Sequence, residues 1–294
     1  MKIQIPTTRD ALLSYYDLSD EFRRRLDSCG TPANWGWVFC KTFACQRCRK
    51  YRARDWAAEA SALFSESRAE NLHWVTIMLE PIADLTRIRP QLKKARKDLR
   101  NLIARFRAQD ERATQLRMYG AFETDWYPTH HVPRLSGYKL TQLAKIGFDY
   151  TASEVWFPHL HVLVDLGGAS EAGFRDLLTR KWPGHRRVHF RNLDETRSRE
   201  TNIANLMSYV LKCKHYYRLD PFRDETASVS RWPAHVVARF HEEIFAHGNF
   251  AFVRFHLKPV EDKSLSEIDE LEAEDSSFYF TSSISQNSYS LYIN

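Results

Sequence analysis

The chain has 294 residues, of which 43% are hydrophobic and 27% charged, and it carries a net charge of +6. This composition is ordinary for a soluble globular protein, and no run approaches the ~18 apolar residues that a membrane helix needs. The first thirty residues carry charges throughout and lack the apolar core of a secretory signal. We therefore expect a cytoplasmic protein with no membrane partner, whose thiols stay reduced.

The alternation of helical and strand-like segments predicts an α+β domain built over a central antiparallel sheet with flanking helices. Helical spacing covers residues 1–28, 49–67, 84–108, 169–181 and 201–217. Short runs rich in β-branched and aromatic residues predict strands over 73–79, 119–127, 159–166 and 187–193. Between the second and third strands, residues 128–150 are expected to form a loop.

Four cysteines lie close together near the N-terminus, at Cys29, Cys40, Cys45 and Cys48. Their short spacings allow four thiolates to converge on one tetrahedral Zn²⁺, and a reducing compartment favours metal over disulfides. Cys29 is the least secure of the four ligands, and His73 is an alternative to it. Cys213 lies far from this cluster in sequence and is expected to pack in the core.

A basic segment follows the cysteines directly. Tyr51 and Trp56 are interleaved with its cations, and aromatic side chains between basic ones suit single-stranded nucleic acid, because bases stack on rings while cations neutralise phosphates. We predict a DNA-binding helix here, although a merely solvated helix face is the alternative. Its candidate contacts are Arg47, Arg49, Lys50, Arg52 and Arg54.

The strand over 159–166 contains a His-hydrophobic-His motif. Alternate residues of a strand share a face, so His159 and His161 point the same way and can bind one divalent cation. Glu123, an acidic residue inside the strand over 119–127, is the predicted third ligand, with His130 and His131 as rivals. Two histidines and one carboxylate also suit a non-haem Fe(II) oxygenase, so the neighbouring residues must distinguish the two chemistries.

A tyrosine lies off the apolar stripe of the helix over 201–217. Tyr209 shares the polar side with Asn202, Asn205 and Lys212, whereas Tyr217 falls on the stripe and is expected in the core. Tyr216 lies two turns beyond Tyr209 on nearly the same face of this predicted helix.

The end of the chain differs in charge from the rest. Residues 261–275 contain eight acidic residues and one lysine, whereas residues 1–260 carry 42 basic and 29 acidic side chains, a net of +13. The basic body favours a polyanionic partner. We expect four regions, namely a zinc-binding, basic segment over 1–68, a catalytic domain over 69–220, a helical extension over 221–260 and a disordered, Ser-rich tail over 261–294.

These motifs resemble, in order, those of the HUH endonucleases, and most closely the plasmid rolling-circle replication initiators. The resemblance spans residues 29–218 and is carried by Phe39-Cys40 to Cys48, Gly120 to Glu123, Pro158 to Leu163 and Ser208 to Lys212. It implies a five-stranded antiparallel sheet with a metal on the central strands and a tyrosine on a flanking helix. It also implies nicking of single-stranded DNA at an origin hairpin, through a 5′-phosphotyrosine, with a free 3′-OH that primes synthesis. A host polymerase and a host helicase are the further partners expected.

Each predicted site residue then has a role. Mg²⁺ or Mn²⁺ on His159, His161 and Glu123 would polarise the scissile phosphate, and Tyr209 would attack it. Lys212 would supply positive charge near the tyrosine or hold the phosphate.

One position departs from the family pattern. The initiators often carry a glutamate four residues before the tyrosine, where this chain has Asn205. An amide has no basic lone pair, so termination would need another group, such as Tyr216 or Glu200. Two other functions remain open, a transposase of the same chemistry and a non-catalytic, zinc-containing DNA-binding regulator.

Overall fold

The fold is described by a computed structural model that covers residues 8–13, 18–34, 36–68, 71–135, 137–145, 151–184, 186–217 and 230–260. Residues 1–259 form one compact unit, and residues from Val260 onward belong to a second. The regions expected over 1–68 and 69–220 are therefore parts of one unit, and the acidic tail over 261–294 lies outside the described residues. In the described ranges, no helix has both the length and the apolar character needed to cross a membrane.

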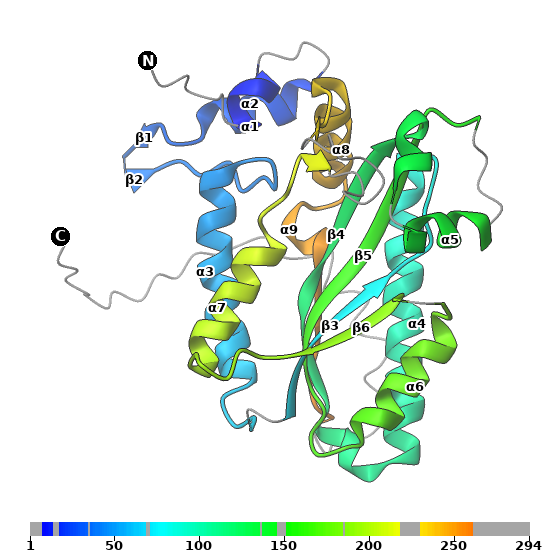
Figure 1. The fold of residues 1–294 in the computed structure, drawn as a ribbon. Coiled ribbons are helices and arrows are strands. Elements are labelled where there is room, and N and C mark those ends of the chain that lie inside the picture. The colour runs from blue at the N-terminus through cyan, green and yellow to red at the C-terminus, as the bar shows by residue number, and fades with distance from the viewer. Residues whose placement is uncertain are drawn as a thin grey trace. The chain divides into compact units, whose positions relative to one another are not determined.

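A five-stranded antiparallel sheet forms the centre of the molecule (Figure 1). Its strand order is β6-β3-β5-β4-β9, so that β5 and β4 lie in the interior of the sheet and β6 and β9 at its edges. The predicted α+β class with a central antiparallel sheet is thereby confirmed. The strands are β3 (Leu72–Met78), β4 (Arg117–Pro128), β5 (Glu154–Asp165), β6 (Val188–Asn192) and β9 (Arg254–Leu257).

Two small hairpins lie outside the sheet, and the helices complete the fold. The hairpins pair β1 (Pro32–Ala33) with β2 (Gly36–Trp37) and β7 (Tyr216–Tyr217) with β8 (Ser230–Arg231). The α-helices are α1 (Thr8–Leu13), α2 (Asp20–Ser28), α3 (Gln46–Leu63), α4 (Ile88–Gln109), α5 (Gly137–Lys145), α6 (Glu171–Lys181), α7 (Arg199–Val210), α8 (Ala234–Ala246) and α9 (Phe250–Val253). The described ranges also contain the 3-10 helices η2 (Leu85–Arg87), η3 (Glu111–Gln115) and η4 (Thr129–Arg134).

Both faces of the sheet carry apolar side chains, and a separate layer of helices covers each face. On one face, Trp56 of α3 packs edge-on against Tyr119 of β4, and α7 packs along α3. On the other face, Phe174 of α6 contacts Phe190 of β6, and α4 lies beside α6 (Figure 1). Central strand β5 is buried along its whole length as a result.

Strands β4 and β5 approach each other closely. In their register Glu123 lies opposite His159, and Gly120 lies opposite Val162. A Cβ atom added at Gly120 would collide with the backbone carbonyl oxygen of His161. Gly120 therefore allows the strand that carries Glu123 to pair tightly with the strand that carries both histidines.

Three element predictions differ from the structure. The helix expected over 201–217 ends at Val210, since Lys212 N donates to Tyr209 O and Cys213 adopts a left-handed backbone conformation with φ of 47°. The segment 128–150, expected to be a loop, contains α5. The region 221–260, expected to be helical, contributes β9 as well as α8, because alternation over only four residues is too short to reveal a strand.

Candidate active site

The sheet register brings one carboxylate and two imidazoles to a single point. Glu123 Oε2 lies 3.4 Å from His159 Nε2 and 3.3 Å from His161 Nε2. Glu123 and His159 are a directly opposed pair, and His161 follows two residues along β5 on the same face. The structure thus unites the three predicted metal-ligating residues on the neighbouring interior strands β4 and β5, on the sheet face that α3 and α7 cover.

Neighbouring side chains fix the orientation of both imidazoles. His159 donates from Nδ1 to the carbonyl oxygen of Phe157 at 3.1 Å, and His161 Nδ1 bonds to Thr76 Oγ1 of β3 at 2.8 Å. The Trp74 ring stacks on His161, with centroids 5.5 Å apart and an interplanar angle of 6°. With each Nδ1 engaged, Nε2 of each ring faces Glu123, an arrangement typical of metal-ligating histidines.

Burying these three polar side chains without a cation is energetically unfavourable. Glu123 Oε2 and His161 Nε2 are buried and have no hydrogen-bond partner among the described residues. Burial lowers the pKa of His161, whereas at His159 the Glu123 and Asp125 carboxylates outweigh burial and raise the pKa. Although burial opposes ionisation of Glu123, the two imidazoles lower its pKa well below the usual range. An anionic carboxylate beside buried imidazole nitrogens fits a divalent cation.

Tyr209 lies directly beside this cluster. It belongs to the last turn of α7, and its ring packs edge-on against His161 and Trp74, at centroid distances of 5.3 Å and 6.5 Å. Its side chain is 39% exposed, which leaves its hydroxyl accessible to a large substrate. The structure therefore joins the predicted tyrosine to the three predicted metal ligands.

The cation nearest the tyrosine is Lys214, not the predicted Lys212. Lys214 Nζ donates to the Tyr209 hydroxyl at 3.4 Å and lies 4.7 Å from the ring centroid. Lys212 is exposed and follows the end of α7, so its prediction from helical spacing fails where the helix ends. Burial lowers the pKa of Lys214, but Glu123 and Tyr209 outweigh it and raise the pKa, so this lysine is charged at neutral pH.

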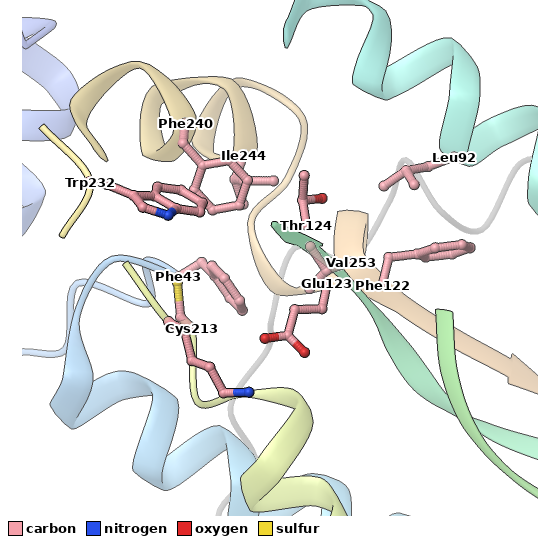
Figure 2. A pocket seen from close by; sticks show the side chains of 11 residues that line it. Phe43, Leu92, Phe122, Glu123, Thr124, Cys213, Trp232, Phe240, Ile244 and Val253 are labelled. Carbon is pink, nitrogen blue, oxygen red and sulfur yellow. The ribbon is translucent and has the colours of Figure 1, made fainter. Parts of the chain in front are cut away.

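Glu123 and Cys213 also line a common cavity next to the sheet. Figure 2 shows their side chains entering it from β4 and from the segment after α7, below Trp232 and Phe240. Lys214 belongs to the same lining. The carboxylate of the cluster is thus reached from a cavity with mostly aromatic and aliphatic walls.

Other residues considered for this site lie elsewhere. Asn205 is exposed one turn before Tyr209, as expected, whereas Asn202 is buried and bonds to the carbonyl oxygen of Asp194 at 2.9 Å. Tyr216 belongs to β7, and so it does not continue the helix face of Tyr209. His131 bonds to Tyr217 at 2.8 Å, and neither it nor His130 belongs to the three-residue cluster.

The four N-terminal cysteines form a second group that could hold a metal such as zinc. All four are buried, and their sulfur atoms lie 3.6 Å apart for Cys29 and Cys45, 3.7 Å for Cys29 and Cys48, and 3.4 Å for Cys40 and Cys48. Zn–S bonds of about 2.3 Å place the sulfurs of a tetrahedron about 3.8 Å apart, close to these values. Cys29 completes the group, and His73 lies on β3 near Glu171 instead.

The structure divides the predicted basic residues after this cluster into two sets. Arg49 is buried and donates to the carbonyl oxygens of Phe43 and Ala44, at 2.7 Å and 3.0 Å, so it cannot reach a phosphate. Trp56 is likewise in the core. Arg52 is half-buried beside Asp55, at 3.7 Å. The exposed set is Arg47, Lys50 and Arg54.

The exposed cations of α3 lie next to exposed aromatic rings. Arg47 covers the Trp37 and Phe39 rings at 5.4 Å and 5.3 Å, and Arg54 lies 5.9 Å from the centroid of Tyr51. Trp37 is 57% exposed and Tyr51 46%. We call Trp37, Phe39, Arg47, Lys50, Tyr51 and Arg54 the α3 platform.

Sequence reasoning missed the residues that support the site from β3 and β6. Trp74 and Thr76 lie on β3, and His189 and Arg191 lie exposed on β6 in register with Thr76 and Trp74. Alternation within both predicted strands assigns these residues to one face each, but the strand order is needed to place β3 next to His161 and β6 next to β3. No family model, curated protein or solved structure matches this chain.

Proposed function

We propose that this protein is a metal-dependent DNA nicking and strand-transfer enzyme of the HUH type that initiates rolling-circle replication of a plasmid or phage-like replicon. One observation carries the proposal, namely that Glu123, His159 and His161 converge beside the accessible Tyr209. The two-histidine, one-carboxylate site of a non-haem iron oxygenase does not require a nucleophilic tyrosine or a charged lysine beside it. A phosphodiester reaction uses both, because it needs a nucleophile and positive charge.

The proposed reaction forms one bond to phosphorus and breaks another. A Mg²⁺ or Mn²⁺ ion held by Glu123, His159 and His161 would supply a Lewis acid for the scissile phosphate. The Tyr209 oxygen attacks phosphorus, and the bond from phosphorus to the 3′ oxygen breaks. The tyrosine proton leaves to solvent, and the 3′ oxygen takes up a proton from solvent as it leaves. The products are a 5′-phosphotyrosine and a free 3′-OH. Lys214, 3.4 Å from the hydroxyl, stabilises the phenolate that attacks.

Two surfaces support single-stranded DNA as the substrate. The α3 platform pairs exposed rings with cations, the combination that stacks bases and neutralises phosphates. On β6, exposed His189 and Arg191 lie in register with the residues that flank His161. Arg175, Arg186 and Arg191 all act on His189, where burial and these cations together lower its pKa. We infer that the strand to be cut crosses β6 on its way to Tyr209.

The four-cysteine group has a structural role in this proposal. We infer that it binds Zn²⁺ and holds the α3 platform in place, since Cys45 and Cys48 belong to the start of α3. In replication, the free 3′-OH would serve a host polymerase, and a host helicase would unwind the duplex ahead of it.

The proposal is tested by covalent capture. Purified protein is incubated with Mn²⁺ and a labelled pool of single-stranded and hairpin oligonucleotides, and adducts are resolved on denaturing gels. We expect an adduct with the unaltered chain and with Tyr216→Phe, which alters a tyrosine of β7 outside the Glu123 cluster. Tyr209→Phe should yield no adduct while DNA binding is retained, because only the attacking oxygen is lost.

The alternatives give different results. A non-catalytic zinc-containing regulator would bind DNA without any adduct, with or without Mn²⁺. A transposase would form the adduct but select transposon ends over origin hairpins in the pool. An adduct that persists in Tyr209→Phe would assign the nucleophile to another residue.

A further inference from the structure

A third group of metal-binding side chains lies between α7 and α8, apart from the two already described. Cys213 and His215 belong to the segment that follows α7, and His241 belongs to α8. Their donor atoms all lie within 4.8 Å of one another. None of the three contributes to the Glu123 cluster or to the four-cysteine group.

The distances between these atoms approach those of a shared ion. Cys213 Sγ lies 3.2 Å from His215 Nε2 and 4.0 Å from His241 Nε2, and the two Nε2 atoms are 2.8 Å apart. A tetrahedral Zn²⁺ with ordinary bond lengths places sulfur and nitrogen about 3.5 Å apart and two nitrogens about 3.3 Å apart. Movements of about half an ångström, within the range of side-chain torsion changes, therefore complete the geometry.

The backbone and the packing gather these donors. Cys213 holds a left-handed backbone conformation, with φ of 47°, which a non-glycine residue adopts only where its surroundings impose it. His241 is 1% exposed, and its Nδ1 has no hydrogen-bond partner among the described residues. Aromatic rings of Phe43, Trp232 and Phe240 surround the group. Two imidazoles and a thiol in an aromatic enclosure form a soft, dehydrated donor set.

We propose that Cys213, His215 and His241 bind a second Zn²⁺ ion. Cysteine and histidine together select zinc over Mg²⁺ or Mn²⁺, which prefer oxygen ligands. Three protein donors leave a fourth coordination position for water. Cys213 also lines the cavity that Glu123 lines (Figure 2). This ion is distinct from the catalytic metal in both position and chemistry.

The consequence of this site is mechanical. Lys214 lies in the chain between the two ligands Cys213 and His215 and donates to Tyr209. An ion bound by Cys213 and His215 would restrict the position of Lys214, which lies in the chain segment after the end of α7. That consequence rests on the proposed function, whereas the metal site itself does not.

The test counts zinc in the full chain. The background variant His159→Gln/His161→Gln removes the catalytic site, so the zinc that remains belongs to the cysteine sites. We expect about two zinc ions per chain in this background. Adding Cys213→Ser or His241→Gln should lower the content by about one ion. His235→Gln, on the exposed side of the same helix α8, is the matched control and should leave it unchanged.

A second measurement does not depend on altering the new site. X-ray absorption at the zinc edge reports the average set of atoms bound to zinc in the background variant. If the four-cysteine group alone held zinc, these atoms would all be sulfur. A mixed shell of sulfur and nitrogen, with imidazole scattering that disappears in His241→Gln, supports the proposal. An all-sulfur shell overturns it, and so does a zinc content that Cys213→Ser and His241→Gln leave unchanged. If the unaltered chain forms no DNA adduct while its zinc content is intact, the proposed function is contradicted and this zinc site still stands.

Discussion

The four-cysteine group and the Glu123 cluster differ in whether a bound cation would keep a coordination position open for another molecule. The cysteines supply four buried thiols, and three pairs of their sulfur atoms lie 3.4–3.7 Å apart. The Glu123 cluster supplies only three donors and lies against an exposed tyrosine. A cation enclosed by four protein ligands contributes to folding, whereas one with free positions can engage a substrate. The number of donors, more than their burial, therefore separates a folding site from a reactive one.

Disrupting the four-cysteine group should cause the largest change, and it should be a change in stability. Cys45→Ser removes a ligand at the start of α3, so we expect zinc to be lost and Tm to fall by about 10 °C or more. Calorimetry with and without chelator measures this effect. Chelation should lower Tm of the unaltered chain to nearly the same value. A Tm that neither change affects would show that this group carries no folding metal.

Disrupting the Glu123 cluster should strongly slow the proposed reaction while the fold remains. For His161→Gln we expect about 10²- to 10³-fold slower formation of the DNA adduct, because the charge that polarises the phosphate is lost. Tm should stay close to that of the unaltered chain. His235→Gln is the control for an exposed histidine. Full adduct formation by His161→Gln in Mn²⁺ would exclude this cluster as the catalytic centre.

The two lysines after α7 distinguish the sequence-based assignment from the structural one. Lys214→Gln should slow adduct formation by about 10- to 100-fold, since the donor to Tyr209 is lost. Lys212→Gln, two residues away and exposed, should be nearly silent. Single-turnover rates at saturating DNA separate this effect from weaker binding. The opposite ranking would restore Lys212 as the functional cation.

A smaller effect on the reaction is expected from Thr76, which does not bind the metal but orients the metal ligand His161. Thr76→Val removes the hydroxyl that bonds to His161 Nδ1 but keeps the shape of the side chain. We expect Mn²⁺ affinity to fall by about 10-fold, measured from the Mn²⁺ dependence of the rate, with the rate at saturation preserved. If saturating Mn²⁺ does not rescue the variant, Thr76 has a role beyond orientation.

The smallest effect should concern how the reaction ends. Asn205 is exposed one turn before Tyr209, and its amide cannot accept a proton from water. Asn205→Glu should leave the rate of adduct formation unchanged but raise the fraction of hydrolysed 5′-phosphate product. The ratio of adduct to hydrolysed product on a gel gives the answer. An unchanged ratio would mean that position 205 does not face the phosphate.

The sequence predicted much of this site because its signals are local. Alternation in one strand assigns His159 and His161 to a common face, and an acidic residue inside a strand identifies Glu123. Cysteine spacing similarly predicted all four members of the N-terminal group. Each of these predictions uses neighbours in the chain, and the sheet register then brought the separate pieces together.

The failures arose where local patterns end or where partners are distant. Helical spacing assigned Lys212 beside Tyr209, but α7 stops at Val210 and the chain turns, so Lys214 reaches the hydroxyl. The sequence pattern indicates that Arg49 is one more surface cation, but its guanidinium donates to two carbonyl oxygens in the interior. Cys213 and His241 are 28 residues apart, a separation at which spacing carries no information about contact.

The packing of α3 along α7 has a consequence for dissecting this protein. Beyond Trp56 on Tyr119, Glu59 of α3 accepts from the Tyr119 hydroxyl at 2.6 Å, and Arg199 at the start of α7 donates to Ser65 O at 2.8 Å. A deletion of residues 1–68, designed to isolate the Glu123 cluster with Tyr209, would therefore expose one side of α7 and an apolar sheet face. We expect such a fragment to aggregate on expression, so a shorter version of this protein would have to be trimmed elsewhere.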